Sequence, residues 1–411
     1  MTSPDADGRF TVFVIAAEES GDLLGARLMR ALHARLGTRV RFLGVGGGRM
    51  EQAGLRSLFA MHDIGLHGIG AVIASLPRLV LRMRRIAAEI VRANPDVLVL
   101  IDAPAFNLRV ARLVRRRNRA IAIVDYVSPT VWAYHPGRAP WMARFVDQVM
   151  AILPFEPRVH SDLGGPPCVY VGHPLLERLD ELRPDAGERR PIEEADRPVL
   201  VVLPGSRRGE IARLMDPFGA AVAGIAERFG DVEVVLPAIA RLVDEIRVRA
   251  AAWPVRPRIV EGEEAKLAAF RRGHAALAAS GTVTLELALA GVPMVVGYRL
   301  DAMSKPARRL VEARSVFKRF LSVRSIVLAN LVLDAAVVPE FLDRECTPDR
   351  LCDALLPLLA PSPERTRQIA AFNRLDNLMA IERDSPSGLA ADVVLETVRA
   401  RRLHAALAQS A

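Results

Sequence analysis

The sequence has few cysteines and no long apolar run. Its three cysteines form no CxxC pair and have no metal-ligand spacing, which is typical of a reduced cytoplasmic protein with free thiols. No run of about 18 apolar residues occurs, and the polar start MTSPDADGRF lacks the apolar core of a signal peptide. We therefore expect no transmembrane helix and a protein that stays in the cytoplasm.

Lysine and aromatic residues are also scarce. Lys266, Lys305 and Lys318 are the only lysines among 56 basic residues, and the chain has a net charge of +9 with 5% aromatic residues. The arginines are scattered along predicted helices without interleaved aromatic side chains, so nucleic acid is not an expected partner. Genome composition, an anionic small ligand or an anionic membrane surface would each account for the charge.

Two phosphate-binding patterns are missing, and a different repeating order takes their place. Neither GxxxxGK[ST] nor GxGxxG occurs at the start of a domain, which disfavours P-loop ATP hydrolysis and hydride transfer. Apolar strands instead alternate with polar turns and amphipathic helices, which predicts parallel sheets covered by helices. We predict an α/β protein with two Rossmann-like doubly wound domains that face a cleft.

The predicted domains follow from where this repeating order breaks. We place the first domain at residues 1–178, a charged linker at 179–197 and the second domain at 198–362. Residues 363–411 are predicted to be helices that pack back on the first domain or on a partner chain. Folds of this kind bind ligands at the carboxyl ends of their strands, and most polar clusters of the chain lie at such ends.

Two strand–turn–helix segments of the second domain are candidate nucleotide-binding sites. Ser280, Gly281 and Thr282 begin a helix whose backbone amides suit a diphosphate, and Glu286 lies where it would accept hydrogen bonds from ribose hydroxyls. A capped helix with a solvated glutamate is the alternative.

In the second segment, Gly205 and Ser206 precede Arg207 at a helix start. An arginine is poorly placed there unless an anion compensates it, and a guanidinium binds phosphate in bidentate fashion. The alternative is an exposed arginine without a ligand.

The first domain offers carboxylates instead of glycines. Glu18, Ser20 and Asp22 follow the first strand, where they would repel phosphate and suit sugar hydroxyls, although Ser20 or Asp22 would also cap the next helix. Asp102 ends the apolar strand VLVLI in the segment that runs to Asn107, a position that favours a general base. A helix cap is the alternative for Asp102.

Other polar and aromatic candidates lie near later strand ends of this domain. Ser128 and Trp132 belong to SPTVWAYH, and His173 lies beside the expected boundary. Trp132 would stack on a sugar or fill the core, and His173 would contact a ligand or be satisfied by the backbone.

Residues 64–77 (IGLHGIGAVIASLP), which four arginines follow, are too short to span a bilayer. They would lie in a membrane interface or form a buried helix.

Taken in order, these segments resemble the lipid-A-disaccharide synthase family of glycosyltransferases. The resemblance runs from ESGDLLGA through IDAP.FN, VSPTVWAY, ILPFEP, VGHPL, LPGSR and SGTVTLE to PMVVGYR. It implies the GT-B fold, inversion at the anomeric carbon, and neither metal nor cofactor. It also implies UDP-2,3-diacylglucosamine as donor and 2,3-diacylglucosamine 1-phosphate (lipid X) as acceptor, with a β-1,6-linked disaccharide 1-phosphate and UDP as products. The family further implies a peripheral protein on the cytoplasmic face of the inner membrane, whose C-terminal segments can exchange within a homodimer.

The resemblance also assigns roles to residues. It implies catalytic carboxylates at Glu18 and Asp102, donor contacts at Arg207 and Glu286, and a further donor contact at Asn330. The acceptor side would include Ser20, Asp22, Asn107, Ser128, Trp132 and His173. The chain departs from the family pattern at Ala17, Glu19 and Ala105, the last of which replaces a second acid, and residues 65–71 lack the usual Met-Gly…Glu pattern. The donor half therefore matches more closely than the acceptor half.

Two other functions fit parts of the sequence. A UDP-N-acetylglucosamine epimerase or a muramyl-lipid glycosyltransferase would use the same fold and a similar nucleotide site. A non-catalytic protein that binds a nucleotide sugar would retain the donor residues without turnover.

Overall fold

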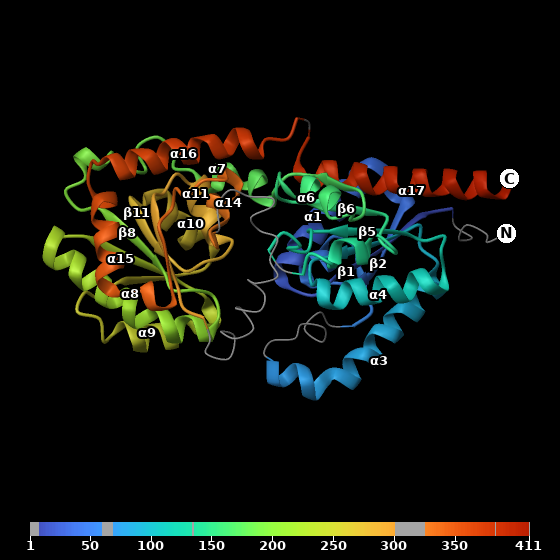
Figure 1. Cartoon of the computed structure of the whole chain (residues 1–411), viewed down its shortest axis with the longest axis horizontal. Helices are drawn as coiled ribbons and strands as arrows, with labels where there is room; N and C mark the ends of the chain where they lie inside the picture. The colour runs from blue at the N-terminus through green and yellow to red at the C-terminus, as the bar shows by residue number, and fades with distance from the viewer. Residues whose placement is uncertain (1–7, 60–68, 134, 301–324, 383, 411) are drawn as a thin grey trace. The chain divides into compact units, whose positions relative to one another are not determined.

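The computed structural model describes residues 8–59, 69–133, 135–300, 325–382 and 384–410, and the chain forms two compact units (Figure 1). The first unit comprises residues 1–176 and 381–411, and the second comprises residues 177–380. The first unit is therefore built from both ends of the chain.

The first unit contains a seven-stranded parallel sheet in the order β3-β2-β1-β4-β5-β6-β7. Its strands are β1 (Phe10–Ala16), β2 (Val40–Val45), β3 (Arg56–Ser57), β4 (Val97–Ile101), β5 (Ala122–Tyr126), β6 (Gln148–Ala151) and β7 (Cys168–Tyr170). Its helices are α1 (Glu19–Leu36), α2 (Gly48–Gln52), α3 (Ile69–Ala93), α4 (Pro104–Arg117), α5 (Arg138–Met142), α6 (Glu156–Asp162) and α17 (Pro386–Ser410).

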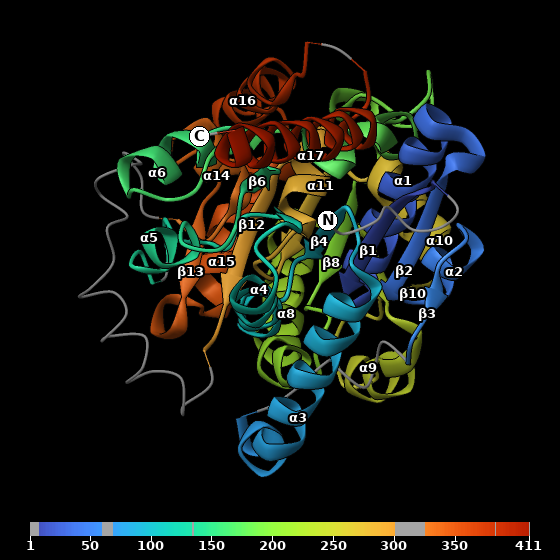
Figure 2. The ribbon, with the colours of Figure 1, turned by 90° about the vertical axis from the view of Figure 1, so that its right-hand side faces the viewer.

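Alternation along the strands divides the first core into two faces. Val12 and Val14 of β1 pack in the cluster that includes residues of α1 and α17, whereas Phe13 and Ile15 pack in the cluster that includes residues of α3 and α4. Figure 2 shows the ribbons of α17 and of α3 and α4 on opposite sides of this sheet. Successive side chains of a strand point to opposite faces, so a strand covered on both sides is apolar throughout. This explains the fully buried VLVLI sequence of β4.

The second unit contains a six-stranded parallel sheet in the order β10-β9-β8-β11-β12-β13. Its strands are β8 (Val199–Leu203), β9 (Glu233–Ala238), β10 (Arg258–Glu261), β11 (Ala275–Ala278), β12 (Met294–Tyr298) and β13 (Glu340–Leu342). Its helices are α7 (Leu179–Leu182), α8 (Arg208–Phe229), α9 (Val243–Ala250), α10 (Glu263–Arg272), α11 (Val283–Leu289), α14 (Leu328–Leu333), α15 (Pro348–Leu355) and α16 (Pro363–Met379). In both units the first strand lies between the second and the fourth, which is the Rossmann order. The predicted α/β class with two such domains is confirmed.

The charged segment 179–197 is part of the second unit. It contributes α7, and the guanidinium of Arg189 donates hydrogen bonds to the carbonyls of Phe270, Arg271, Ala290 and Gly291 at 2.8–3.0 Å. Burial, followed by the nearby charge of Arg365, lowers the pKa of Arg189 to about 10. Because so many bonds hold it, this segment is a packed part of the unit.

The two C-terminal helices belong to different units. In α16, the side chain of Gln368 bonds both the amide and the carbonyl of Met294 on β12, at 2.8 and 3.1 Å. In α17, Asp392 pairs with Arg35 of α1. The chain therefore returns to its first unit only for its last 31 residues, 381–411.

Among the described residues, no helix is both long enough and apolar enough to cross a membrane. Of the predicted interfacial stretch 64–77, residues 64–68 lie outside the described residues, and 69–77 form the beginning of α3.

Candidate active site

A pocket of about 530 Å³ lies in the second unit beside the carboxyl ends of β8, β9 and β11. We call it the β8–β11 pocket. Seven of the predicted donor residues line it: Gly205, Ser206, Arg207, Ser280, Gly281, Thr282 and Glu286. Two segments about 75 residues apart in sequence thus meet at one site, as expected for neighbouring parallel strands.

The turn between β11 and α11 is held open toward this pocket. Ser280 Oγ donates to the carbonyl of Ile326 at 2.7 Å. Gly281 has a φ of +149°, a backbone conformation that residues other than glycine rarely adopt. The amides of Gly281, Thr282 and Val283 donate to no acceptor among the described residues. Unbonded amides of this kind are suited to an anionic ligand.

Lys266 of α10 is a pocket residue that the sequence did not reveal. Its Nζ lies 2.9 Å from Glu286 Oε2 and 3.1 Å from Glu263 Oε2. The pair fixes one oxygen of Glu286, while Oε1 makes no hydrogen bond to the described residues. A single lysine within a helix belongs to no recognisable sequence motif. The only feature that sets Lys266 apart in the sequence is that lysine is rare in this chain.

The turn between β8 and α8 is arranged by a carboxylate. Gly205 has a φ of +115°, and a Cβ placed there would lie 2.5 Å from Glu210 Oε2. That oxygen accepts hydrogen bonds from the amides of Ser206 and Arg207 at 2.9 and 3.2 Å. From the sequence, an anionic ligand was expected to compensate the arginine at this helix start. The carboxylate of Glu210 takes that place, because it already accepts hydrogen bonds from the amides that precede α8.

The side chain of Arg207 nevertheless extends from the pocket wall into solvent. It is 76% exposed, and its Nη1 lies 3.4 Å from Glu210 Oε1. The guanidinium is free to reorient because this contact is long. Any contact with a bound anion would come from the side chain of Arg207 and not from its backbone amide.

Asn330 does not line the β8–β11 pocket. It is 1% exposed, and its amide group bonds the backbone of Val337 and Val338 at 2.8–3.0 Å and Ser325 Oγ at 3.2 Å. With these partners its side chain holds the loop after α14. The donor contact at Asn330 was implied by the resemblance, and the sequence alone does not show this burial.

In the first unit, Asp102 lies on a strained turn at the carboxyl end of β4. Asp102 and Ala103 have φ values of +53° and +45°, a region that non-glycine residues rarely occupy. Asn107 Nδ2 stabilises the turn by donating to the carbonyls of Ile101 and Asp102 at 3.1 and 2.7 Å. Strain of this kind is concentrated at functional sites. Asn107 therefore holds the backbone at Asp102 in place.

The strand before Asp102 is paired with β1, so the loop after β1 lies next to it. Ala16 is in register with Ile101, and the exposed side chains of Glu18 and Ser20 follow. Asp22 is different, because it is 5% exposed and accepts hydrogen bonds from the amides at the start of α2 at 2.8–3.1 Å. Its carboxylate is thereby committed to capping α2, whereas Glu18 and Ser20 remain accessible.

Asp125 is a second carboxyl near Asp102 that the sequence did not single out. It is 1% exposed within β5, and its Oδ2 has no hydrogen-bond partner among the described residues. Burial, followed by the nearby charge of Asp102, raises the pKa of Asp125 well above its usual range. The carboxyl of Asp125 is thus harder to ionise than an ordinary aspartate. An aspartate inside the apolar run IAIVDYV was the available signal.

The comparison with known protein families decides what this pair of units is. A family model described as lipid-A-disaccharide synthetase matches residues 12–393. The chain belongs to the lipid-A-disaccharide synthase family. It is accordingly a hexosyltransferase of lipid A biosynthesis, and the resemblance of its ordered motifs is confirmed.

Curated members of the family match along almost their whole length. A lipid-A-disaccharide synthase from Nitrobacter winogradskyi is 52% identical over 391 residues, which cover 95% of this chain and 96% of the relative. One from Bradyrhizobium diazoefficiens is 49% identical and covers 96% and 98%. One from Rhodospirillum centenum is 40% identical and covers 95% of each chain.

Solved structures with the same fold are more distant in sequence. A putative UDP-N-acetylglucosamine 2-epimerase from Listeria monocytogenes has a TM-score of 0.60 at 17% identity and covers 95% of this chain and 96% of its own. MurG from Acinetobacter baumannii has a TM-score of 0.52 at 14% identity and covers 94% and 99%. These likenesses show the GT-B type of fold.

In this member of the family, several predicted acceptor residues form a buried network. Ser128 Oγ lies 2.9 Å from His160 Nε2, and Trp132 Nε1 donates to Glu156 Oε1 at 3.2 Å. His173 is also buried, and its Nδ1 accepts from the amide of Leu175 at 3.2 Å. Burial lowers the pKa of His173 to about 4. Ser128, Trp132 and His173 thus form hydrogen bonds within the unit, and Trp132 is buried in its core.

The buried carboxyl of Glu156 should make stability depend on pH. Burial is the main cause that raises its pKa from 4.5 to about 7, so between these values the folded protein keeps a proton that the unfolded chain releases. This contribution favours folding below about pH 4.5 and is lost as the pH rises to about 7.

Glu156→Gln removes that titration. We expect the stability of the variant relative to wild type to rise by about 2 kcal/mol between about pH 5 and about pH 8, measured by urea unfolding. His160 titrates in both proteins, so its effect cancels. A difference that stays constant across this range would show that Glu156 is ionised in the folded protein throughout.

In the parts of the chain that the structure describes, no three His, Cys, Asp or Glu side chains gather in a way that would hold a metal ion.

Proposed function

We propose that the protein joins UDP-2,3-diacylglucosamine to 2,3-diacylglucosamine 1-phosphate, with inversion at the anomeric carbon. The products are a β-1,6-linked disaccharide 1-phosphate and UDP. The observation that supports this most directly is the β8–β11 pocket, which gathers two predicted nucleotide-binding turns and Glu286 in one cavity. The UDP-sugar is a substrate, and the proposed reaction requires neither cofactor nor metal.

The pocket residues divide the donor between them. The carboxylate of Glu286, oriented by Lys266, accepts hydrogen bonds from the ribose hydroxyls. The unbonded amides of the turn at residues 281–283 and the guanidinium of Arg207 bind the diphosphate. As UDP leaves with its charge, these donors stabilise the negative charge that develops on the diphosphate.

Asp102 is the proposed general base. The C6 hydroxyl of the acceptor attacks the anomeric carbon of the donor, its proton passes to Asp102, and the bond to UDP breaks. Asp125 is buried in the neighbouring strand β5, where the nearby charge of Asp102 adds to the effect of burial in raising the pKa of Asp125. Glu18 lies on the neighbouring strand end and is proposed to orient the acceptor.

We also propose that the enzyme acts as a peripheral protein on the cytoplasmic face of the inner membrane and forms a homodimer. Both substrates of the proposed reaction carry acyl chains, and the net charge of +9 suits an anionic surface.

Incubation with UDP-2,3-diacylglucosamine and 2,3-diacylglucosamine 1-phosphate, followed by mass spectrometry, tests the reaction. We expect a disaccharide 1-phosphate and one UDP per linkage formed. The fold is also that of a UDP-N-acetylglucosamine 2-epimerase. Conversion of the sugar nucleotide alone, without any disaccharide, would support epimerisation and overturn the proposed transfer.

Removing pocket side chains should weaken nucleotide binding. We expect Glu286→Ala to cost about 2 kcal/mol of UDP affinity, since a partly buried charged hydrogen bond is lost. We expect Arg207→Ala to cost about 1 kcal/mol, because that side chain is largely exposed. Calorimetry with UDP measures both. Glu264→Ala, an exposed carboxylate of α10 outside the pocket, is the control. Equal affinities in all four proteins would place the nucleotide elsewhere.

A further inference from the structure

A second cavity, of about 590 Å³, lies in the first unit at the end of α4 that is remote from Asp102. We call it the arginine pocket. Its charged lining consists of six arginines and one aspartate: Arg112, Arg115, Arg116, Arg119, Arg144, Arg401 and Asp147. Helix α4 has 14 residues and is therefore about 20 Å long, so the pocket is separate from the strand ends proposed for catalysis.

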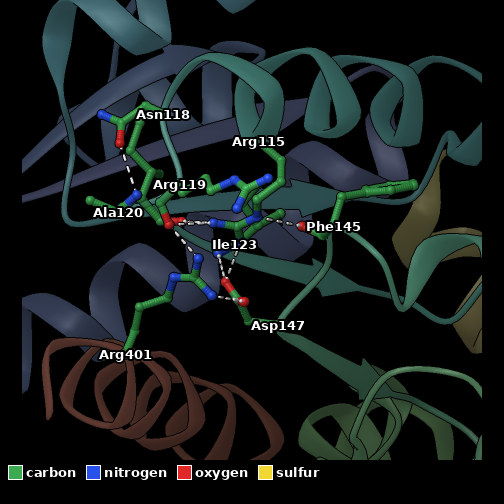
Figure 3. A network of polar contacts seen from close by, with 9 residues as sticks. Arg115, Asn118, Arg119, Ala120, Ile123, Phe145, Asp147 and Arg401 are labelled. Atoms are coloured by element: carbon green, nitrogen blue, oxygen red, sulfur yellow. Dashed lines mark hydrogen bonds and ion pairs between the residues drawn. The ribbon is translucent and has the colours of Figure 1, made fainter. Parts of the chain in front are cut away.

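The single carboxylate of the arginine pocket is already occupied (Figure 3). Asp147 Oδ2 accepts from Arg115 Nη2 at 2.6 Å and from the amide of Ile123 at 2.8 Å. Asp147 Oδ1 pairs with Arg401 of α17. Two guanidinium groups thus share one negative charge, and both oxygens of the carboxylate are already bonded.

Backbone carbonyls fix the floor of the pocket. Arg115 is buried, and it donates to the carbonyls of Phe145, Arg119 and Ile121 at 3.3, 2.8 and 2.9 Å. Arg401 also bonds the carbonyl of Arg119 (Figure 3). Because Arg401 belongs to the last helix and Arg119 follows α4, these bonds bring distant segments together around a rigid cationic floor.

Four arginines at the rim have no compensating charge. Arg112, Arg116, Arg119 and Arg144 are exposed and form no ion pair with the described residues. Some exposed arginines elsewhere do form ion pairs, as Arg197 does with Asp231, Arg228 with Asp353 and Arg258 with Glu233. Like charges gathered in a cavity repel one another, and a bound anion relieves that repulsion.

We propose that the arginine pocket binds an anion that carries at least two phosphate charges. The cavity has room for more than one phosphate group, and planar guanidinium groups bind phosphate oxygens in bidentate fashion. The anion is either free in solution or part of a phospholipid headgroup, and both present the same chemistry. This site is additional to the donor and acceptor sites of the proposed reaction.

Calorimetry with inorganic pyrophosphate tests the free anion. The measurements include saturating UDP, so that the β8–β11 pocket does not contribute. The pocket variant is Arg112→Gln/Arg116→Gln/Arg144→Gln, and the control is Arg30→Gln/Arg39→Gln/Arg117→Gln, which removes the same charge from exposed positions outside the pocket. We expect the pocket variant to lose pyrophosphate affinity by at least about tenfold and the control by less than about twofold.

Vesicle flotation with the same three proteins tests the headgroup. The vesicles contain phosphatidylcholine with or without cardiolipin, a phospholipid whose headgroup carries two phosphate charges. Loss of binding to the anionic vesicles in the pocket variant alone identifies a lipid headgroup as the source. Unchanged vesicle binding with lost pyrophosphate binding identifies a free anion. If the pocket variant matches its control in both assays, charge alone explains the results and the proposed site is wrong.

Discussion

Asp102→Asn is expected to lower the turnover number by about 10²–10⁴-fold while leaving UDP affinity almost unchanged. Asparagine has nearly the same shape as aspartate but cannot take the proton of the attacking hydroxyl. Asp102 also belongs to the first unit, whereas every residue that lines the β8–β11 pocket belongs to the second. Steady-state kinetics and UDP calorimetry on one preparation separate the two effects.

The strained turn at Asp102 requires a control for folding. Asn107 bonds the backbone carbonyl of Asp102, so the turn does not depend on the aspartate side chain. Equal thermal stability of wild type and variant would therefore be expected. Glu19→Gln removes an exposed carboxylate at the start of α1 and should retain near-normal turnover. If Asp102→Asn also retains it, another group accepts the proton.

Asp147→Ala should cost about 3–5 kcal/mol of unfolding free energy. The variant leaves the buried guanidinium of Arg115 beside Arg401 without a counter-charge, and an unpaired buried charge is far more costly than the loss of an exposed pair. Burial already lowers the pKa of Arg115, and the charge of Asp147 opposes that lowering. Urea unfolding near neutral pH measures the loss.

The matched control is Asp231→Ala, which breaks an exposed ion pair with Arg197. Both partners are more than half exposed, at 58% and 72%, so we expect a loss of less than about 1 kcal/mol. Similar losses in the two variants would mean that Asp147 acts only as a surface charge and that Arg115 is stabilised by its carbonyl partners alone.

The sequence predicted the fold because the fold depends on apolar patterning. Strands such as VLVLI are buried on both faces, and the polar turns after them mark their carboxyl ends. The same logic located Ser280, Gly281 and Gly205, since turns after apolar strands at one sheet edge meet in space. The prediction of the family succeeded because many such segments occur in order.

The hydrogen-bond and ion-pair partners of individual side chains could not be predicted from the sequence. Lys266 and Glu210 lie within helices and reach the pocket only through the packing of α10 and α8. Asp22 and Asn330 have the residue types of ligand contacts, yet neighbouring backbone amides use their oxygens. Whether a polar side chain binds a ligand or a nearby amide depends on tertiary contacts, which local pattern does not encode.

The return of α17 to the first unit has a consequence for biosynthesis. Ribosomes make chains from the amino end, and a first domain ordinarily folds before the next is complete. Here one face of the β1–β7 sheet includes Ala390, Val394 and Val398 in its core, and these residues follow the whole of the second unit in the chain. The second unit, residues 177–380, has all its parts sooner. The first unit therefore completes its core only after the whole of the second unit has been made.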